Sequence, residues 1–363
     1  LKALDIGESI EWFNNNAINN CVALERINFY ATNYKTGTSL KYGNSGVILN
    51  DEGKEGPGIT LFIGNKVPKI SLEFEGSIYL KSVIFEDDSV IQSVSFKGCS
   101  SLENIELPNS VKYIPSYGYV GCPLKSIKLS ENLEEIGTEA FRDCETLEMI
   151  DFPNSLLKIG DRAFQGCILL KDIKIPNSVT ELGNAIFKGC SYIESMTIPF
   201  VGASRSARST YDQVFGWIFG YSSYYGATNN KSSDTIYQCK VQNTSNRAYF
   251  YNYYIPSSIT SVTITGGTIN DNSFTNCTMI NKVLVCKDVT TLGYEAFYGC
   301  NQLQYIEIEE GLSTIGERAF GGCTSLSELV IPQSLTKILR AAFKDCELIK
   351  SIYYKGSASE WGN

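Results

Sequence analysis

A motif about 23 residues long recurs along this chain, and it constrains the fold more than any other feature. Two of its clearest copies begin at Ile159 and Ile315 and read IGDRAFQGCILLKDIKIPNSVTE and IGERAFGGCTSLSELVIPQSLTK. A unit this short cannot bury its apolar face alone, so successive copies must stack and share one continuous core. The 363 residues therefore need not form one ordinary compact domain.

Each position of the repeat has a physical reason. The Ile-x-Ile pair directs two side chains to one face of a short strand, with the middle residue on the other face. Pro follows the pair in six copies, where its missing backbone donor suits the end of a strand. Glycine near the start of the motif indicates a tight turn. The glycines at this position are Gly137, Gly160, Gly183, Gly293 and Gly316.

The Ala-Phe pair of the motif supplies one small and one large core residue. Because the phenylalanine recurs at one position of every regular copy, we expect these rings to stack as an aromatic ladder inside the coil. The ladder residues are Phe141, Phe164, Phe187, Phe274, Phe297, Phe320 and Phe343.

The first residue of each Ile-x-Ile pair marks one turn. The fourteen markers are Leu4, Ile27, Leu61, Val83, Ile105, Ile127, Ile150, Ile173, Met196, Val262, Val283, Ile306, Leu329 and Ile352. They lie 21–23 residues apart except for one step of 34 and one of 66 residues. This period, with Leu-x-x-Leu-x-Leu inside it, is typical of a leucine-rich-repeat solenoid.

We therefore predict a leucine-rich-repeat solenoid of about 14 turns, each of about 23 residues. One parallel β-sheet should lie on the concave face, and short helical or irregular turns on the convex face. We expect residues 1–363 to form a single domain, with insertions or degenerate turns at about 30–58 and about 200–254.

The cysteines follow the repeat. Ten of the twelve fall on one position, which favours a buried ladder of thiols over a disulfide framework. That position holds Cys21, Cys99, Cys122, Cys144, Cys167, Cys190, Cys277, Cys300, Cys323 and Cys346. No pair has the short spacing of a zinc site. Cys239 and Cys286 lie outside the column, and Cys239 is the better candidate for an exposed thiol.

Composition excludes several classes of function. The chain has no histidine, which removes Ser-His-Asp and Cys-His catalysis and His-ligated metal sites. Its formal charge of −8 gives no basic surface for nucleic acid, and no apolar run is long enough to insert into a membrane. The chain starts at Leu1 inside a repeat, so we expect a trimmed or mature form whose signal peptide is not visible.

The Ala-Phe-x-x-Cys and Ile-Pro-Asn-Ser-Val elements resemble those of the BspA-like, or Treponema pallidum-type, leucine-rich-repeat family of bacterial surface proteins. They are clearest at 163–167 and 175–179. The large insertion and the ending at 353–361 are also similar to that family. The resemblance implies an extracellular or cell-surface location and adhesion to host matrix proteins or other cells. It implies no catalytic residue and no cofactor.

Charges alternate on the outward positions of the middle strands. Adjacent strands carry opposite signs there, which favours a cross-strand charge ladder that keeps the sheet in register. One column holds Glu106, Lys128, Asp151 and Lys174, and the other holds Lys81, Glu103, Lys125, Glu148, Lys171 and Glu194. A surface that neutralises itself in this way attracts highly charged ligands poorly.

Two regions are candidates for ligand contact. Apolar and aromatic residues replace the ladder on the C-terminal strands, at Leu284, Tyr305, Val330 and Tyr353, and such clusters often mark contact surfaces. Alternatively, they lie against another domain of a longer protein. The second region is the large insertion, where residues 211–254 hold 13 aromatic residues among 44.

Tyr with Ser, Gly and Asn in the insertion is typical of binding loops. The candidate contacts there are Tyr221, Tyr224, Tyr225, Tyr249, Tyr251 and Tyr253. We expect Phe215, Trp217 and Phe219 instead to dock the insertion onto the solenoid.

These features favour a non-catalytic adhesion module that binds a protein on a host or microbial surface. A glycan-binding module is an alternative, because aromatic faces also suit sugar rings. A structural spacer that displays another domain is a further one. An Asp/Glu pair could in principle hydrolyse glycosides, but no acidic pair departs from the repeat in a way that indicates a cleft.

Overall fold

The structure, a computed structural model, describes residues 2–11, 23–32, 58–68, 76–205, 212–220, 235–244 and 247–357. They divide into two compact units, unit 1 (residues 1–169) and unit 2 (residues 170–363), and each is described by itself. The predicted single domain therefore stays a prediction. No helix in the described part of the chain is both long and apolar enough to cross a bilayer.

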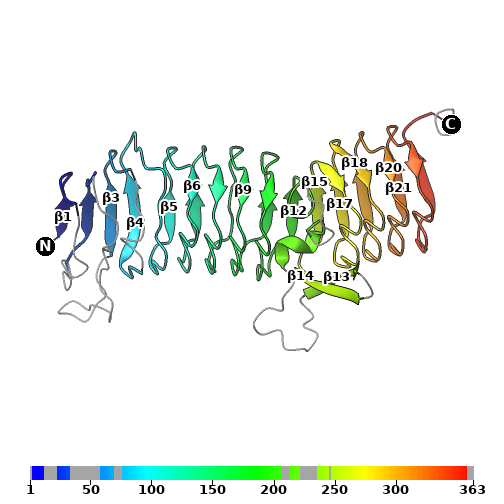
Figure 1. Ribbon diagram of the computed structural model, residues 1–363, viewed down its shortest axis with the longest axis horizontal. Coiled ribbons are helices and arrows are strands. Elements are labelled where there is room, and N and C mark those ends of the chain that lie inside the picture. Colours follow the sequence, from blue (N-terminus) through cyan, green and yellow to red (C-terminus); the bar gives the residue numbers. More distant parts are fainter. Residues whose placement is uncertain are drawn as a thin grey trace. The chain divides into compact units, whose positions relative to one another are not determined.

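Short parallel strands in each unit form the predicted sheet (Figure 1). Thirteen of the fourteen marker residues lie in these strands, the exception being Ile150. In unit 1 the strands are β1 (Ala3–Ile6), β2 (Arg26–Phe29), β3 (Ile59–Ile63), β4 (Leu80–Phe85), β5 (Asn104–Glu106) and β7 (Ser126–Lys128). In unit 2 they are β10 (Asp172–Lys174), β12 (Ser195–Ile198), β15 (Ser261–Ile264), β17 (Lys282–Val285), β19 (Tyr305–Ile308), β21 (Glu328–Ile331) and β23 (Ser351–Tyr354).

A second row of strands, which the sequence did not predict, lies on another side of each turn. In unit 1 it holds β6 (Tyr113–Ile114), β8 (Glu135–Ile136) and β9 (Lys158–Ile159). In unit 2 it holds β11 (Glu181–Leu182), β16 (Gly267–Ile269), β18 (Val289–Leu292), β20 (Thr314–Ile315) and β22 (Lys337–Ile338). Most of these strands have only two residues, which is too short for alternation to show in a sequence.

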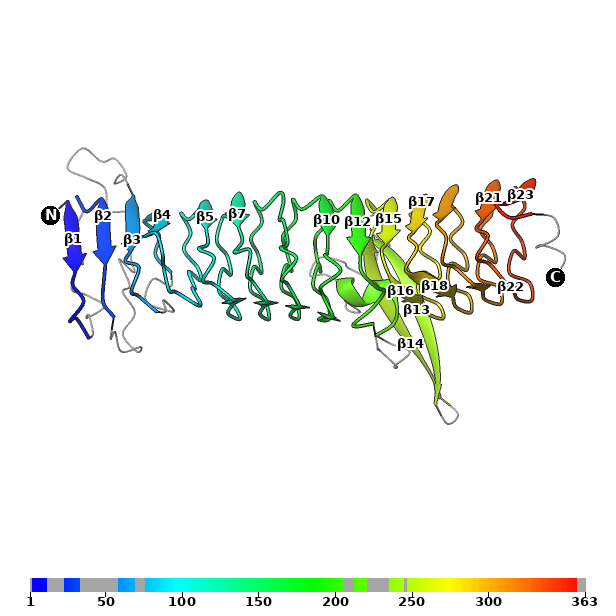
Figure 2. The same ribbon diagram turned by 90° about the horizontal axis from the view of Figure 1, so that it is seen from above.

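The remaining elements belong to the large insertion. A 3₁₀ helix, η1 (Phe215–Phe219), precedes an antiparallel hairpin of β13 (Thr235–Thr244) and β14 (Arg247–Pro256). Figure 2 shows this hairpin extending away from the turns of unit 2. Apart from η1, the residues that the structure describes contain no helix.

The solenoid prediction is confirmed, with about 12 turns rather than 14. The two numbers of turns differ little, because the fourteen marker residues enclose only thirteen intervals. The step of 34 residues is an excursion rather than a missing turn, since β2 pairs directly with β3. Residues 33–57 of the insertion predicted at about 30–58 lie outside the described part of the chain.

The predicted aromatic ladder is present in both units. In unit 1, Tyr119 takes the place of a phenylalanine and stacks on Phe141 with 5.2 Å between ring centroids, and Phe141 stacks on Phe164 at 5.1 Å. In unit 2, Phe297 lies between Phe274 at 4.9 Å and Phe320 at 5.6 Å. These near-parallel rings are fully buried and fill the core at the corner of each turn.

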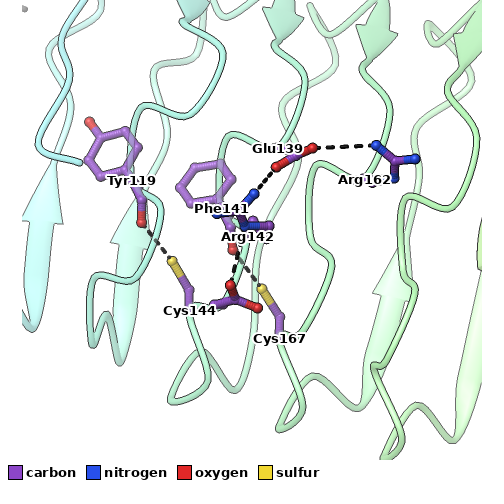
Figure 3. A network of polar contacts seen from close by, with 8 residues as sticks. Tyr119, Glu139, Phe141, Arg142, Cys144, Arg162 and Cys167 are labelled. Carbon is purple, nitrogen blue, oxygen red and sulfur yellow. Dashed lines mark hydrogen bonds and ion pairs between the residues drawn. The ribbon is translucent and has the colours of Figure 1, made fainter. Parts of the chain in front are cut away.

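The cysteine column is also confirmed as a buried ladder without disulfides among the described residues. Six of the described thiols donate a hydrogen bond to the carbonyl oxygen of the aromatic residue one turn earlier. Cys144 Sγ lies 3.1 Å from Tyr119 O, and Cys167 Sγ lies 3.1 Å from Phe141 O (Figure 3). Burial raises the pKa of Cys122 to about 12, so this thiol stays neutral at physiological pH.

The repeated glycines are required by stacking between turns rather than by a left-handed backbone. A Cβ on Gly160 would lie 2.6 Å from the backbone nitrogen of Thr138 in the preceding turn, and one on Gly316 would lie 2.4 Å from Gly293 O. The left-handed positions are instead filled by other residues, such as Glu139 (φ 54°) and Arg162 (φ 53°). The glycines also begin tight turns, as predicted, because Ala163 N donates to Gly160 O at 3.3 Å and Ala319 N donates to Gly316 O at 3.2 Å.

Replacing Gly160 by Ala should destabilise unit 1 by about 1–3 kcal/mol, because the added methyl group meets backbone that cannot move away. Gly7→Ala is the matched control, since a Cβ at Gly7 meets nothing within 4 Å. Urea unfolding followed by circular dichroism measures both variants. Equal stabilities for the two would contradict the stacking argument.

Replacing Tyr119 by Phe should stabilise unit 1 by about 1 kcal/mol. Its hydroxyl oxygen is buried without a hydrogen-bond partner, and the substitution removes that desolvation cost while keeping the stacked ring. Tyr113→Phe is the control, because Tyr113 is exposed. Thermal unfolding of both variants is the measurement, and a lower midpoint for Tyr119→Phe would show that the hydroxyl contributes to the fold.

Candidate functional site

The sheet face of unit 1 carries paired charges. Lys125 Nζ lies 2.8 Å from a carboxylate oxygen of Glu103, and Lys128 forms an ion pair with Glu106 on the adjacent strand. All four side chains are exposed, so each pair contributes at most about 1 kcal/mol to stability. The predicted charge ladder is confirmed for these two pairs, and it leaves this stretch of the face without unpaired charge.

The sheet face of unit 2 is different, as the sequence predicted. Tyr305 is 50% exposed, Val330 38% and Tyr353 54%, while Leu284 is partly exposed. Val330 and Tyr353 are directly opposite each other on β21 and β23. We call Leu284, Tyr305, Val330 and Tyr353 the apolar face. They share one side of parallel strands and are open to solvent.

Tyr305 is held in place within this apolar face. Lys282 Nζ lies 5.7 Å from the centre of its ring, and its hydroxyl donates a 3.0 Å hydrogen bond to Glu307. That hydrogen bond to a carboxylate raises the pKa of Tyr305, so the hydroxyl stays protonated. The ring is therefore preorganised, which lowers the entropy that a contact would lose.

The first part of the large insertion is a turn of the solenoid. Phe215 packs against Phe274 with 4.9 Å between ring centroids and an angle of 35° between the rings, and Phe215 and Phe219 are buried. Trp217 Nε1 donates a 2.9 Å hydrogen bond to Leu182 O. The expectation that these three residues dock the insertion is confirmed. Of the two alternatives for residues 200–254, an insertion or a degenerate turn, the part around η1 fits a degenerate turn, because η1 occupies the corner of a regular turn.

Backbone hydrogen bonds hold η1 between its two neighbouring turns. Ala185 N donates to Trp217 O at 2.9 Å, and Phe187 N donates to Ile218 O at 2.8 Å. On the other side, Phe215 N donates to Ser273 O at 2.8 Å. Regular corners are joined in the same way, so the true excursion from the solenoid follows Gly220.

The hairpin brings three of the tyrosine candidates to alternate positions of one strand. Tyr249, Tyr251 and Tyr253 lie opposite Gln242, Lys240 and Gln238 in β13. Tyr253 is only 1% exposed, so its candidacy as a surface contact was wrong: at the base of the hairpin its ring is covered. Only the backbone of Tyr249 and Tyr251 is described, and Tyr221, Tyr224 and Tyr225 lie outside the described residues.

Carboxylates at the corners are tied to arginines. Glu139 is buried and forms ion pairs with Arg142 and, at 3.5 Å, with Arg162 (Figure 3). The equivalent Glu295 of unit 2 pairs with Arg318 at 2.9 Å. The ion pairs Glu139–Arg162 and Glu295–Arg318 each link two adjacent turns. Within the described residues, no group of three or more Cys, Asp or Glu side chains is arranged to hold a metal ion.

Sequence reasoning missed a groove in unit 1, with a volume of about 790 Å³, beside the ends of β4, β5 and β7. Its most unusual lining residues are Glu86, Asp87 and Asp88. The sequence did hold a signal for it. Where other repeats continue as Pro-Asn-Ser, the fourth strand is followed by these three acidic residues.

A family model described as "BspA type Leucine rich repeat region" matches residues 71–200 and 243–363 in six copies. No curated protein sequence matches the chain significantly.

Three solved bacterial structures are similar to parts of the chain. A leucine-rich repeat protein from Bacteroides ovatus is 24% identical, with a TM-score of 0.47, over 96% of this chain and 86% of that one. A leucine rich cell surface protein from Faecalibacterium prausnitzii is 23% identical, with a TM-score of 0.31, over 75% and 85%. The leucine-rich-repeat protein of T. pallidum is 20% identical, with a TM-score of 0.35, over 75% and 79%.

Replacing Phe215 by Ala should destabilise unit 2 by about 3–5 kcal/mol, because the cavity would lie between two stacked turns. Trp217→Phe should cost about 1 kcal/mol through the lost hydrogen bond to Leu182 O. Denaturant unfolding of both variants checks this order. If Phe215→Ala costs no more than Trp217→Phe, η1 is not an integral turn of the solenoid.

Proposed function

Because the chain belongs to the BspA-type leucine-rich-repeat family, we propose that it is a non-catalytic binding module of a bacterial cell-surface or secreted protein. Its partner is a protein on a host or microbial surface. The single observation that carries the proposal is the apolar face of unit 2, which replaces charge pairs with exposed aromatic and aliphatic side chains. Catalysis has no comparable support, since the corner carboxylates Glu139 and Glu295 are paired with arginines.

The chemistry of the apolar face suits a protein partner. Exposed Tyr and aliphatic residues that share one face are typical of the core of protein interfaces, whereas charged residues are depleted there. Tyr305 adds a ring that is already oriented by Lys282 and Glu307. A fixed aromatic side chain with a polar tip contributes much of the affinity in many interfaces.

The hairpin supports the same function. Its second strand, β14, ends at Pro256, and β15 of the sheet begins at Ser261, so hairpin and sheet are linked by four residues. Its strands bring tyrosines to alternate positions, and tyrosine-rich ribbons bind partners with little loss of side-chain entropy. A glycan is the second candidate partner, favoured by the exposed rings of Tyr305 and Tyr353.

Binding of the purified chain to immobilised matrix and bacterial surface proteins tests the proposal. A triple variant of the apolar face (Tyr305→Ser, Val330→Ser, Tyr353→Ser) should bind at least about tenfold more weakly. The matched control replaces three exposed residues away from that face, Tyr113, Leu157 and Tyr192, by serine. A further variant replaces residues 221–254 by a short Gly-Ser linker.

The outcomes separate the alternatives. Weaker protein binding by the triple variant but not by the control supports the apolar face, and loss with the linker variant adds the hairpin. Undiminished binding by both would overturn the assignment of this surface. If no protein binds but a glycan array gives hits that the triple variant loses, the partner is a sugar.

A further inference from the structure

The first sheet of unit 1 is interrupted between β4 and β5. Strands β1 to β4 form one parallel sheet and β5 and β7 form another, although residues 76–205 are described without a gap. A second break in this row of unit 1 follows β7, since the turn marked by Ile150 has no strand there. At the first break β4 and β5 are neighbours without the hydrogen bonds of a β-ladder.

A groove of about 790 Å³ lies at this interruption, on the side where β4, β5 and β7 end. This volume is within the range of sites that bind small ligands or peptide segments, roughly 300–1,000 Å³. Its apolar surface comes from Ile84, which is 50% exposed, and from Phe85 and Pro108. These side chains give the acidic groove an apolar part that a ligand can contact.

The groove is strongly acidic. Five carboxylates line it, against a single lysine, Lys128, which already forms an ion pair with Glu106. The carboxylates are those of Glu86, Asp87, Asp88, Glu106 and Glu131. Like charges that lie close together repel, so a cationic group among them is stabilised. Beside the groove, Glu103 is paired with Lys125, so the excess of acidic charge is a property of the groove rather than of that neighbouring pair.

A polar group in the groove wall lacks a partner inside the chain. Ser110 Oγ is buried and has no hydrogen bond. At the equivalent position of the repeat, Ser155 Oγ donates to Leu133 O at 2.7 Å and Ser334 Oγ to Leu312 O at 2.9 Å, whereas Ser178 Oγ is buried without a partner like Ser110 Oγ. The turn before Ser110 departs from the repeat at Asp88, which has a φ of 58°. The unpartnered hydroxyl is therefore not particular to the groove, whose distinguishing features are its charge and its exposed apolar residues.

We propose that this acidic groove binds an extended peptide segment of another protein that carries lysine or arginine beside an apolar residue. The carboxylates attract the cationic side chains, and Ile84, Phe85 and Pro108 contact the apolar one. A metal ion is a poor match, since no three of the described acidic side chains are grouped to hold one. This site lies within unit 1 and does not depend on the apolar face of unit 2.

The test uses a fluorescein-labelled peptide of alternating lysine and valine with glycine at both ends, and fluorescence anisotropy with the whole chain. Asp87→Asn, Asp88→Asn and Glu106→Gln together should weaken binding at least about tenfold, and Ile84→Ser should weaken it severalfold. Asn at position 88 tolerates the positive φ. The matched control neutralises three exposed acids of unit 1 outside the groove: Glu145→Gln, Glu148→Gln and Asp151→Asn.

Three comparisons make the result decisive. The proposal is supported if the groove variant loses the peptide while the control keeps its affinity within about twofold, and if a glycine-for-valine peptide binds less well. Equal weakening of groove and control variants would mean attraction by net charge alone and would overturn it. Failure of the peptide to bind at about 50 mM salt, where screening is weak, would also overturn it. Circular dichroism of each variant confirms that the fold is retained.

Discussion

The distance from one turn to the next is the constraint on which the rest of this structure depends. Backbone hydrogen bonds between parallel strands set it at about 4.8 Å. Every column of side chains must then repeat at nearly the same distance. Flat rings meet this condition at 4.9 to 5.6 Å between centroids in the described stacks, and thiols meet it by donating to the carbonyl of the preceding turn.

The same distance leaves no room for a side chain at the repeated glycines. A Cβ on Gly160 or Gly316 would overlap backbone atoms of the neighbouring turn. Close approach there and stacking in the core are therefore two consequences of one spacing. Glu139 and Arg162 occupy left-handed positions of neighbouring turns. The spacing between turns is short enough for their side chains to form an ion pair.

Surface properties vary along the chain because only outward positions escape this constraint. In unit 1, outward positions of the strands hold opposite charges that pair between neighbouring strands. In unit 2, Tyr305, Val330 and Tyr353 occupy such positions. Where three successive acids follow β4, the strands are no longer paired and a groove forms. Such departures from the repeat are where a solenoid can acquire a binding surface without altering its core.

The sequence alone determined the solenoid, the aromatic ladder, the buried thiol column and the contrast between the two sheet faces. These features follow from residues of one type that recur at a fixed period, and every repeat that stacks on its neighbours keeps that period. It also determined that Phe215, Trp217 and Phe219 dock the insertion. It left open whether residues 200–254 are an insertion or a degenerate turn, because η1 forms a regular corner from residues that do not match the motif.

Only the tertiary structure decided which residues of the irregular parts are covered and where neighbouring strands are not paired. Tyr253 belongs to a tyrosine-rich run in the sequence, yet it is buried because of its place at the base of the hairpin. The acidic groove likewise needs β4 and β5 to lie side by side without pairing. The period of the sequence determines the features that every turn shares with its neighbours. The burial of single side chains and the position of a groove depend instead on how turns of different sequence pack against each other.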